Sequence, residues 1–194
     1  MSQNEALSVE VALKLLLEGN KRYMEGKLLH PNRGFMRRME TAERQKPFAI
    51  VLGCADSRVS PEIIFDQGIG DIFTVRVAGN VLGSLELDSI EFASLQFQSP
   101  ILIVLGHENC NAVSAVVKGD TREIESIAAL IEPAIKKAKN LPGDIVTNAV
   151  KMNVEYVVQQ LKNSQVLAYA IEERKLAIVG GYYHLEDGHV EVIY

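Results

Sequence analysis

Three side chains of this sequence have the chemical types and the spacing of a metal site. Cys54 follows the apolar run 48–53, and His107 and Cys110 follow a second apolar run, 101–106. Two thiolates and one imidazole suit zinc, which takes sulfur and nitrogen ligands in a tetrahedral arrangement. Structural zinc sites are normally closed by four such ligands, and a set of three leaves a position for water or substrate. The pattern therefore favours a zinc site of the catalytic kind.

Other chemistry is compatible with the same residues. The chain has two cysteines, and this number excludes a disulfide framework. The alternatives to metal binding are one bridge between Cys54 and Cys110, two plain core residues, or a thiol nucleophile with His107 as its base. The bridge is disfavoured because nothing in the sequence points to an oxidising compartment.

A carboxylate and a guanidinium lie close to the first cysteine. Asp56 and Arg58 come two and four residues after Cys54. A guanidinium can hold a carboxylate through two hydrogen bonds, keep it ionised and fix its orientation. Held in this way, Asp56 would accept a hydrogen bond from a water on the metal, or would itself take the fourth metal position. The alternative is an ion pair that only shapes the loop.

The elements that must position these residues alternate between strand and helix. Apolar runs predict strands at 48–53, 71–77, 101–106, 176–183 and, at an edge, 189–193. Helical periodicity predicts helices from the cap Ser8 to about Glu25, at 35–44, from the cap Ser84 to about Phe97, and at 122–139, 143–163 and 165–174. This order indicates an α/β fold with a mainly parallel sheet, in which ligands bind beyond the carboxyl ends of the strands. If the first and third strands are neighbours, the two cysteines and the histidine meet there.

The composition is that of an ordinary globular chain. Its 194 residues correspond to one domain of typical size, so we expect a single domain over 1–194. The apolar run at 101–105 is far too short for a transmembrane helix, and the first residues, MSQNEALSVE, do not resemble a secretory signal. A dense basic stripe with interleaved aromatic residues is also lacking. We therefore expect no membrane or nucleic-acid partner, and a cytoplasmic location.

Charge is unevenly distributed along the chain. The formal net charge is −5, yet residues 1–46 carry nine Lys and Arg against six Glu. The remainder, 47–194, is correspondingly acidic. One interpretation is a solvated surface, and the other is a basic N-terminal arm that packs on an acidic partner subunit.

The motif that runs from Cys54 through Asp56 to Arg58, followed by His107 and Cys110, resembles the zinc site of β-class carbonic anhydrases. The resemblance extends to the segment FDQGIGDIFTVRVAGN at 65–80, to GYYHLEDGHVEV at 181–192 and to the N-terminal helices. It therefore covers nearly the whole chain.

The resemblance implies a three-layer fold around a mixed sheet of four mainly parallel strands plus an edge strand. It also implies a homodimer, or a dimer of dimers, in which the N-terminal helical arm 1–46 packs on the neighbouring subunit. Val51 stands where the subgroup with a non-catalytic bicarbonate site usually has tryptophan. The chain is therefore more similar to the non-allosteric, plant-like subgroup.

The resemblance also implies roles for individual residues. Cys54, His107 and Cys110 take the positions of the zinc ligands, one zinc ion per subunit. Asp56 and Arg58 take those of the catalytic dyad, with Asp56 a fourth ligand in a closed state. The substrate-binding positions match Gln45, which would act from across the dimer interface, and the pocket residues Phe73 and Phe92.

The implied reaction is the reversible hydration of carbon dioxide to bicarbonate and a proton, by attack of zinc-bound hydroxide. One residue departs from the family pattern, because Asn111 follows Cys110 where the family usually has glycine. Glycine there would permit positive φ or close backbone approach, and asparagine tolerates the left-handed region. Two other functions stay open for this reason: hydrolysis of carbonyl sulfide or carbon disulfide, and zinc binding with little turnover.

Overall fold

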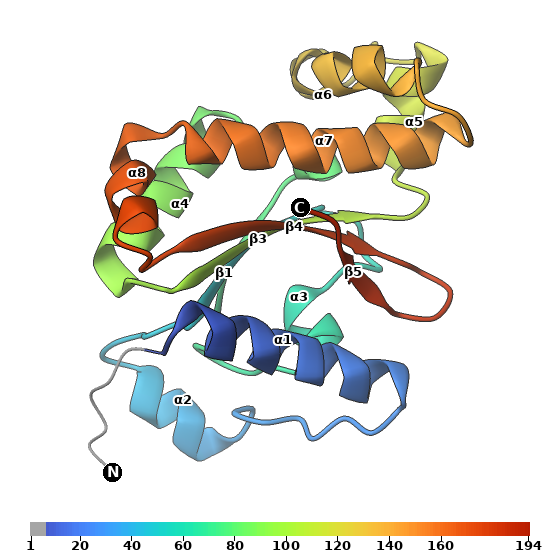
Figure 1. Ribbon diagram of the computed structural model, residues 1–194. Coiled ribbons are helices and arrows are strands. Elements are labelled where there is room, and N and C mark those ends of the chain that lie inside the picture. Colours follow the sequence, from blue (N-terminus) through green and yellow to red (C-terminus); the bar gives the residue numbers. More distant parts are fainter. Residues whose placement is uncertain (1–6) are drawn as a thin grey trace.

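A five-stranded sheet lies at the centre of the computed structural model, which describes residues 7–194 (Figure 1). The strands follow the order β2 (Ile72–Arg76), β1 (Ala49–Gly53), β3 (Ile101–His107), β4 (Ala177–Tyr183) and β5 (Val190–Val192). The first four are parallel and β5 is antiparallel to β4. The prediction of a mixed, mainly parallel sheet with an edge strand is confirmed.

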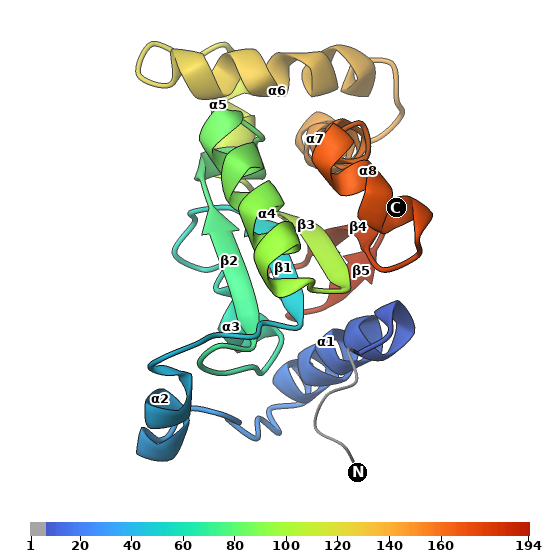
Figure 2. The same cartoon turned by 90° about the vertical axis from the view of Figure 1, so that its left-hand side faces the viewer.

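Helices cover both faces of the sheet and give three layers (Figures 1 and 2). One face carries α1 (Val9–Met24) and α3 (Pro61–Ile64), with α2 (Phe35–Thr41) farther out. The other layer consists of α4 (Ser84–Phe97), α5 (Asn111–Lys118), α6 (Glu125–Ala138), α7 (Ile145–Lys162) and α8 (Gln165–Glu172). A short 3-10 turn, η1 (Ala78–Asn80), connects β2 to α4.

Successive residues of the central strands point to opposite layers. In β1, Ile50 and Leu52 pack with α4 and α7, whereas Ala49 and Val51 pack with α1 and α3. Because both faces are covered, every residue of β1 and β3 is buried. This double burial explains why the two strands appear in the sequence as continuous apolar runs rather than as alternating ones.

The first helix is fixed to the last hairpin by one buried side chain. Ser8 caps α1 as expected, accepting from the Val11 N–H at 3.3 Å. Farther along this helix, Asn20 donates to the carbonyls of Ile64 at 3.2 Å and Gly188 at 2.8 Å, and accepts from the Val190 N–H at 2.9 Å. One amide therefore satisfies three backbone groups of α3 and of the β4–β5 hairpin.

Several predicted helix bounds are wrong. Gly83, not Ser84, caps α4, and the Glu86 carboxylate accepts from its N–H at 3.1 Å. The helix expected at 122–139 begins at Glu125, and the one expected at 35–44 ends at Thr41. Two short helices, α3 and α5, were not predicted: the four residues of α3 are too few for a helical period, whereas α5, with eight residues, is as long as α8, which was predicted.

Between residues 7 and 194 no helix has the length and apolar character needed to cross a membrane.

We predict that Asn20→Ala destabilises the fold strongly. It leaves three buried backbone groups without partners, and each such group costs about 1–3 kcal/mol, so the free energy of unfolding should fall by at least about 3 kcal/mol. Urea denaturation followed by circular dichroism measures this change. The matched control is Asn140→Ala on an exposed helix end, with an expected change within about 0.5 kcal/mol. Equal, small losses of stability in both variants would contradict this role of the Asn20 hydrogen bonds.

Candidate metal centre

The pairing of β1 with β3 brings the three expected ligands together. The two strands are parallel neighbours, so the residues that come after them emerge at the same edge of the sheet. The sulfur atoms of Cys54 and Cys110 are 4.0 Å apart. They lie with a ring nitrogen of His107 in one group whose ligand atoms are all within 4.8 Å of one another. The expected convergence of the three residues is confirmed.

This group fits a zinc ion in both donor chemistry and spacing. Two Zn–S bonds of about 2.3 Å at a tetrahedral angle separate their sulfurs by about 3.8 Å, close to the observed distance. The Nδ1 atom of His107 contacts the Glu108 carbonyl oxygen at 2.8 Å, which makes Nδ1 the protonated nitrogen. Its Nε2 atom is buried and has no hydrogen-bond partner within residues 7–194. A buried, unprotonated ring nitrogen without a hydrogen-bond donor is what a histidine that binds a metal presents to the ion.

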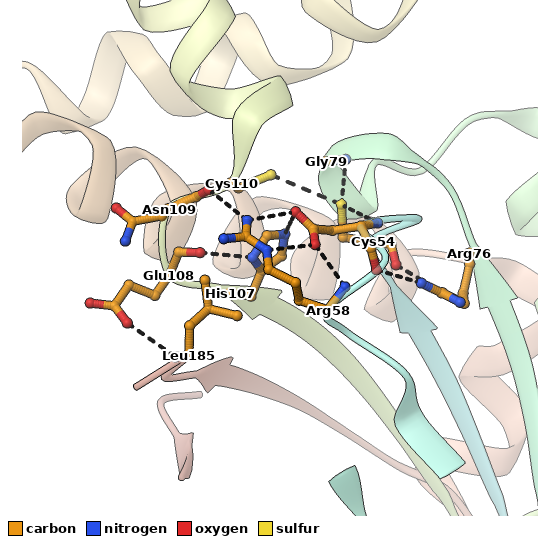
Figure 3. A network of polar contacts seen from close by, with 10 residues as sticks. Cys54, Arg58, Arg76, Gly79, His107, Glu108, Asn109, Cys110 and Leu185 are labelled. Atoms are coloured by element: carbon orange, nitrogen blue, oxygen red, sulfur yellow. Dashed lines mark hydrogen bonds and ion pairs between the residues drawn. The ribbon is translucent and has the colours of Figure 1, made fainter. Parts of the chain in front are cut away.

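The residue next to the histidine fixes the local backbone. His107 is the last residue of β3 and is paired with Tyr183 of β4. The Glu108 N–H donates to the Tyr183 carbonyl at 2.8 Å, and the Glu108 carboxylate accepts from the Leu185 N–H at 3.0 Å. Figure 3 shows this residue on the far side of the histidine from the cysteines. No motif in the sequence distinguishes Glu108 from other surface acids, so its role was not predicted.

The two thiols differ in acidity because they share a hydrogen bond. The pKa of Cys54 is lowered, above all because the Cys110 thiol donates to its sulfur, and also by His107 and two backbone N–H groups, against the effect of burial. The pKa of Cys110 is raised by the same hydrogen bond and by burial. The shared hydrogen bond therefore makes the Cys54 sulfur the more acidic of the two.

Backbone donors also converge on the sulfur of Cys54. The N–H of Gly79 lies 3.2 Å from it and the N–H of Asp56 lies 3.4 Å from it. Figure 3 shows the contact from Gly79 as a dashed line to the sulfur. Such donors stabilise negative charge on sulfur.

Asp56 and Arg58 form the expected ion pair. Both Nε of Arg58, at 3.0 Å, and its backbone N–H, at 2.9 Å, donate to Oδ1 of Asp56, and Nη2 donates to Oδ2 at 2.8 Å. These bonds from Arg58 hold the pKa of the Asp56 carboxyl at about 2, against the opposing effect of burial. Its Oδ2 lies 4.0 Å from Nε2 of His107. The carboxylate is therefore ionised, fixed and adjacent to the ligand group.

A second arginine holds the backbone of the same loop. Arg76, at the end of β2, donates through Nε to the Cys54 carbonyl at 2.9 Å and through Nη2 to the Asp56 carbonyl at 2.6 Å (Figure 3). One guanidinium thus holds the main chain at both Cys54 and Asp56. This role of Arg76 was not predicted, because contacts to main-chain oxygens leave no motif in the sequence.

The three expected substrate residues lie elsewhere in this chain. Gln45 and Phe92 line one open hollow beside α4, and Phe92 is 57% exposed. The ring of Phe73 lies 5.8 Å from that of Phe97, and Phe73 pairs with Ile50 near the start of β1. At about 3.3 Å per strand residue, this is roughly 10 Å before the edge that carries the cysteines. One chain by itself does not assemble these residues with the ligand group.

The departure at Asn111 is accommodated by the backbone. Asn111 is the first residue of α5 and is exposed, and the residue that takes positive φ is Asn109, at 51°. The backbone therefore does not require glycine after Cys110.

Comparisons with known proteins agree with this geometry. The family model described as "Carbonic anhydrase" matches residues 49–190. The "Carbonic anhydrase" of Mycolicibacterium smegmatis is 40% identical over 188 residues, 93% of this chain and 91% of that protein. "Carbonic anhydrase 2" of Mycobacterium tuberculosis is 38% identical, over 91% of this chain and 89% of that protein.

Solved structures show the same fold. The Coccomyxa β-carbonic anhydrase in complex with acetazolamide is 26% identical, with a TM-score of 0.72 over 93% of this chain and 86% of that one. A tetrameric β-carbonic anhydrase from Sordaria macrospora gives 0.72 over 94% of this chain and 97% of that one, at 20% identity. From sequence and fold together, this chain belongs to the β-carbonic anhydrase family of carbonate dehydratases.

Proposed function

We propose that this chain catalyses the reversible hydration of carbon dioxide to bicarbonate and a proton, at a zinc ion held by Cys54, His107 and Cys110. One observation carries the proposal: the buried Nε2 of His107, which has no hydrogen-bond partner among residues 7–194, lies within a Cys–His–Cys group, 4.0 Å from an ionised carboxylate. A site that only stabilised the fold would not need a carboxylate held in this way.

Asp56, Arg58 and Arg76 have separate roles beside a bound zinc ion. Bound zinc would supply the Lewis acid that makes water a nucleophile near neutral pH. The carboxylate of Asp56 accepts a hydrogen bond from the attacking water and so orients it toward the carbon of carbon dioxide. Arg58 keeps that carboxylate ionised through two hydrogen bonds from its side chain. Arg76 fixes the loop by its main-chain oxygens.

We propose further that a second copy of the chain completes the substrate pocket. The exposed positions of Gln45 and Phe92 support this, because both lie away from the cysteines of their own chain. Helix α2 has no buried residue and exposes Phe35, Met36 and Met39, an apolar surface suited to a partner. The N-terminal arm 1–46 would thus contribute α2 to the dimer interface, although α1 packs on the sheet of its own chain.

Three finer assignments stay predictions. The non-allosteric, plant-like subgroup rests on Val51, a residue of β1 that is fully buried. Titration of the activity with bicarbonate tests that assignment. Cell fractionation tests the cytoplasmic location, and a single domain over 1–194 is tested by one cooperative unfolding transition.

We predict that Asp56→Asn lowers kcat for carbon dioxide hydration by about 100-fold or more, because the neutral amide loses the charged pairing with Arg58 and can turn an N–H instead of an oxygen toward the attacking water. Stopped-flow hydration measures turnover, and elemental analysis measures zinc, which should stay at one ion per chain. The matched control is Asp120→Asn, an exposed aspartate, with unchanged turnover. Full activity in Asp56→Asn would refute the dyad. Hydrolysis of carbonyl sulfide without hydration of carbon dioxide would identify the sulfur analogue as the substrate.

We predict that Arg58→Gln raises the pKa of Asp56 from about 2 toward its ordinary 3.8, because the hydrogen bonds from the guanidinium are lost. Titration of the Asp56 side-chain carbon by NMR, in metal-free protein, measures this shift. Since the folded-state pKa is depressed, this group stabilises the native protein fully above about pH 4, and the effect is lost as the pH falls toward 2. If the titration curves of Asp56 in Arg58→Gln and in the wild type coincide, Arg58 does not lower the pKa of this carboxyl.

We predict that Gln45→Ala and Asp56→Asn chains complement each other. In a mixed dimer, one site receives both defects and the other receives neither if Gln45 acts on the partner's metal centre. Subunit exchange of two impaired preparations should therefore raise stopped-flow activity well above that of either alone. If Gln45 acts within its own chain, every site keeps one defect and mixing restores nothing.

A further inference from the structure

A polar side chain lies buried in the apolar stripe of α7 and is not explained by the site as described. Asn153 is 1% exposed, in a helix face whose neighbouring residues Val150, Val154 and Val157 are all buried. Burial of an amide is unfavourable unless the amide is hydrogen-bonded. An apolar residue would satisfy the packing of this face equally well, so the amide must serve a contact.

That contact is one-sided. Nδ2 of Asn153 donates to the Gly79 carbonyl oxygen at 2.9 Å, whereas Oδ1 has no partner among the described residues. The helix approaches closely because the strands below it carry glycine: a Cβ at Gly106 would lie 2.6 Å from Val154 and one at Gly180 would lie 2.7 Å from it. The close approach brings the amide within reach of the η1 turn.

The backbone at Gly79, whose carbonyl accepts this hydrogen bond, has an uncommon conformation. Gly79 has φ 73°, and a Cβ there would lie 2.9 Å from Ile131 Cδ1, so another residue at this position would be strained chiefly by its backbone conformation. The next residue, Asn80, also has positive φ, 42°. In this conformation the Gly79 N–H points at the sulfur of Cys54, at 3.2 Å (Figure 3).

We propose that Asn153 is a positioning residue of the metal centre: through the Gly79 carbonyl it holds the turn in which the Gly79 N–H donates to Cys54. This inference rests on the proposed zinc site. A hydrogen bond to a metal-bound thiolate withdraws charge from the sulfur, weakens its donation and leaves the metal a stronger acid. A remote helix thus offsets part of the charge that two thiolates bring to the ion.

The test uses Asn153→Leu, which keeps the branched shape of the side chain, with a somewhat larger volume, and removes the donor. Full-length protein is freed of metal with a chelator and loaded with Co2+, whose thiolate charge-transfer band reports the charge on sulfur. The band should move to longer wavelength in the variant, and kcat of the zinc form should fall by about tenfold with KM unchanged. If Asn153→Leu does not fold, Asn153→Ala is measured in the same way.

Val157→Ala is the matched control, because Val157 is buried on the same helix face and makes no contact of this kind. It should lower Tm and leave the cobalt band unchanged. A band in Asn153→Leu that coincides with wild type, or an equal shift in Val157→Ala, would overturn the role of Asn153. Wild-type protein that binds neither zinc nor cobalt would instead overturn the proposed function.

Discussion

The parallel pairing of β1 with β3 is the constraint on which the site depends. It places the residues after Gly53 and those after Gly106 at one edge of the sheet, although more than fifty positions separate them in sequence. Both strands are buried on both faces, so a shift of register would expose apolar side chains to the wrong layer. The energy of burial therefore fixes the ligand geometry before any metal binds.

Around this edge of the sheet, several polar groups form hydrogen bonds with main-chain atoms. Arg76 binds two carbonyl oxygens, Glu108 binds the N–H of Leu185, and Gly79 donates to a sulfur. A contact to a main-chain atom orders at most one side chain, so it fixes the loop after β1 with less loss of rotamer entropy than a pair of side chains would. On the side of the site that faces solvent, Asp56 and Arg58 pair with each other through their side chains.

Long patterns in the sequence predict the strands of this fold and the ligands beyond them, whereas single contacts leave no pattern. Doubly buried strands are continuous apolar runs, so β1 and β3 could be located from the sequence alone. Helix α3, with four residues, is too short to show a period. The contacts of Arg76 and Asn153 join positions 20 to 74 residues apart, to main-chain atoms that every residue carries. Such partners are defined by the fold and leave no trace in local sequence.

The buried amide of Asn20 joins residues that lie far apart along the chain. Its partners Gly188 and Val190 lie 168 and 170 positions later. The apolar layer under the sheet includes Leu16 from the first helix and Val190 from the last strand. Contacts of such high sequence separation form only after a long loop has closed. Packing of α1 on this face therefore depends on long-range chain closure rather than on local structure.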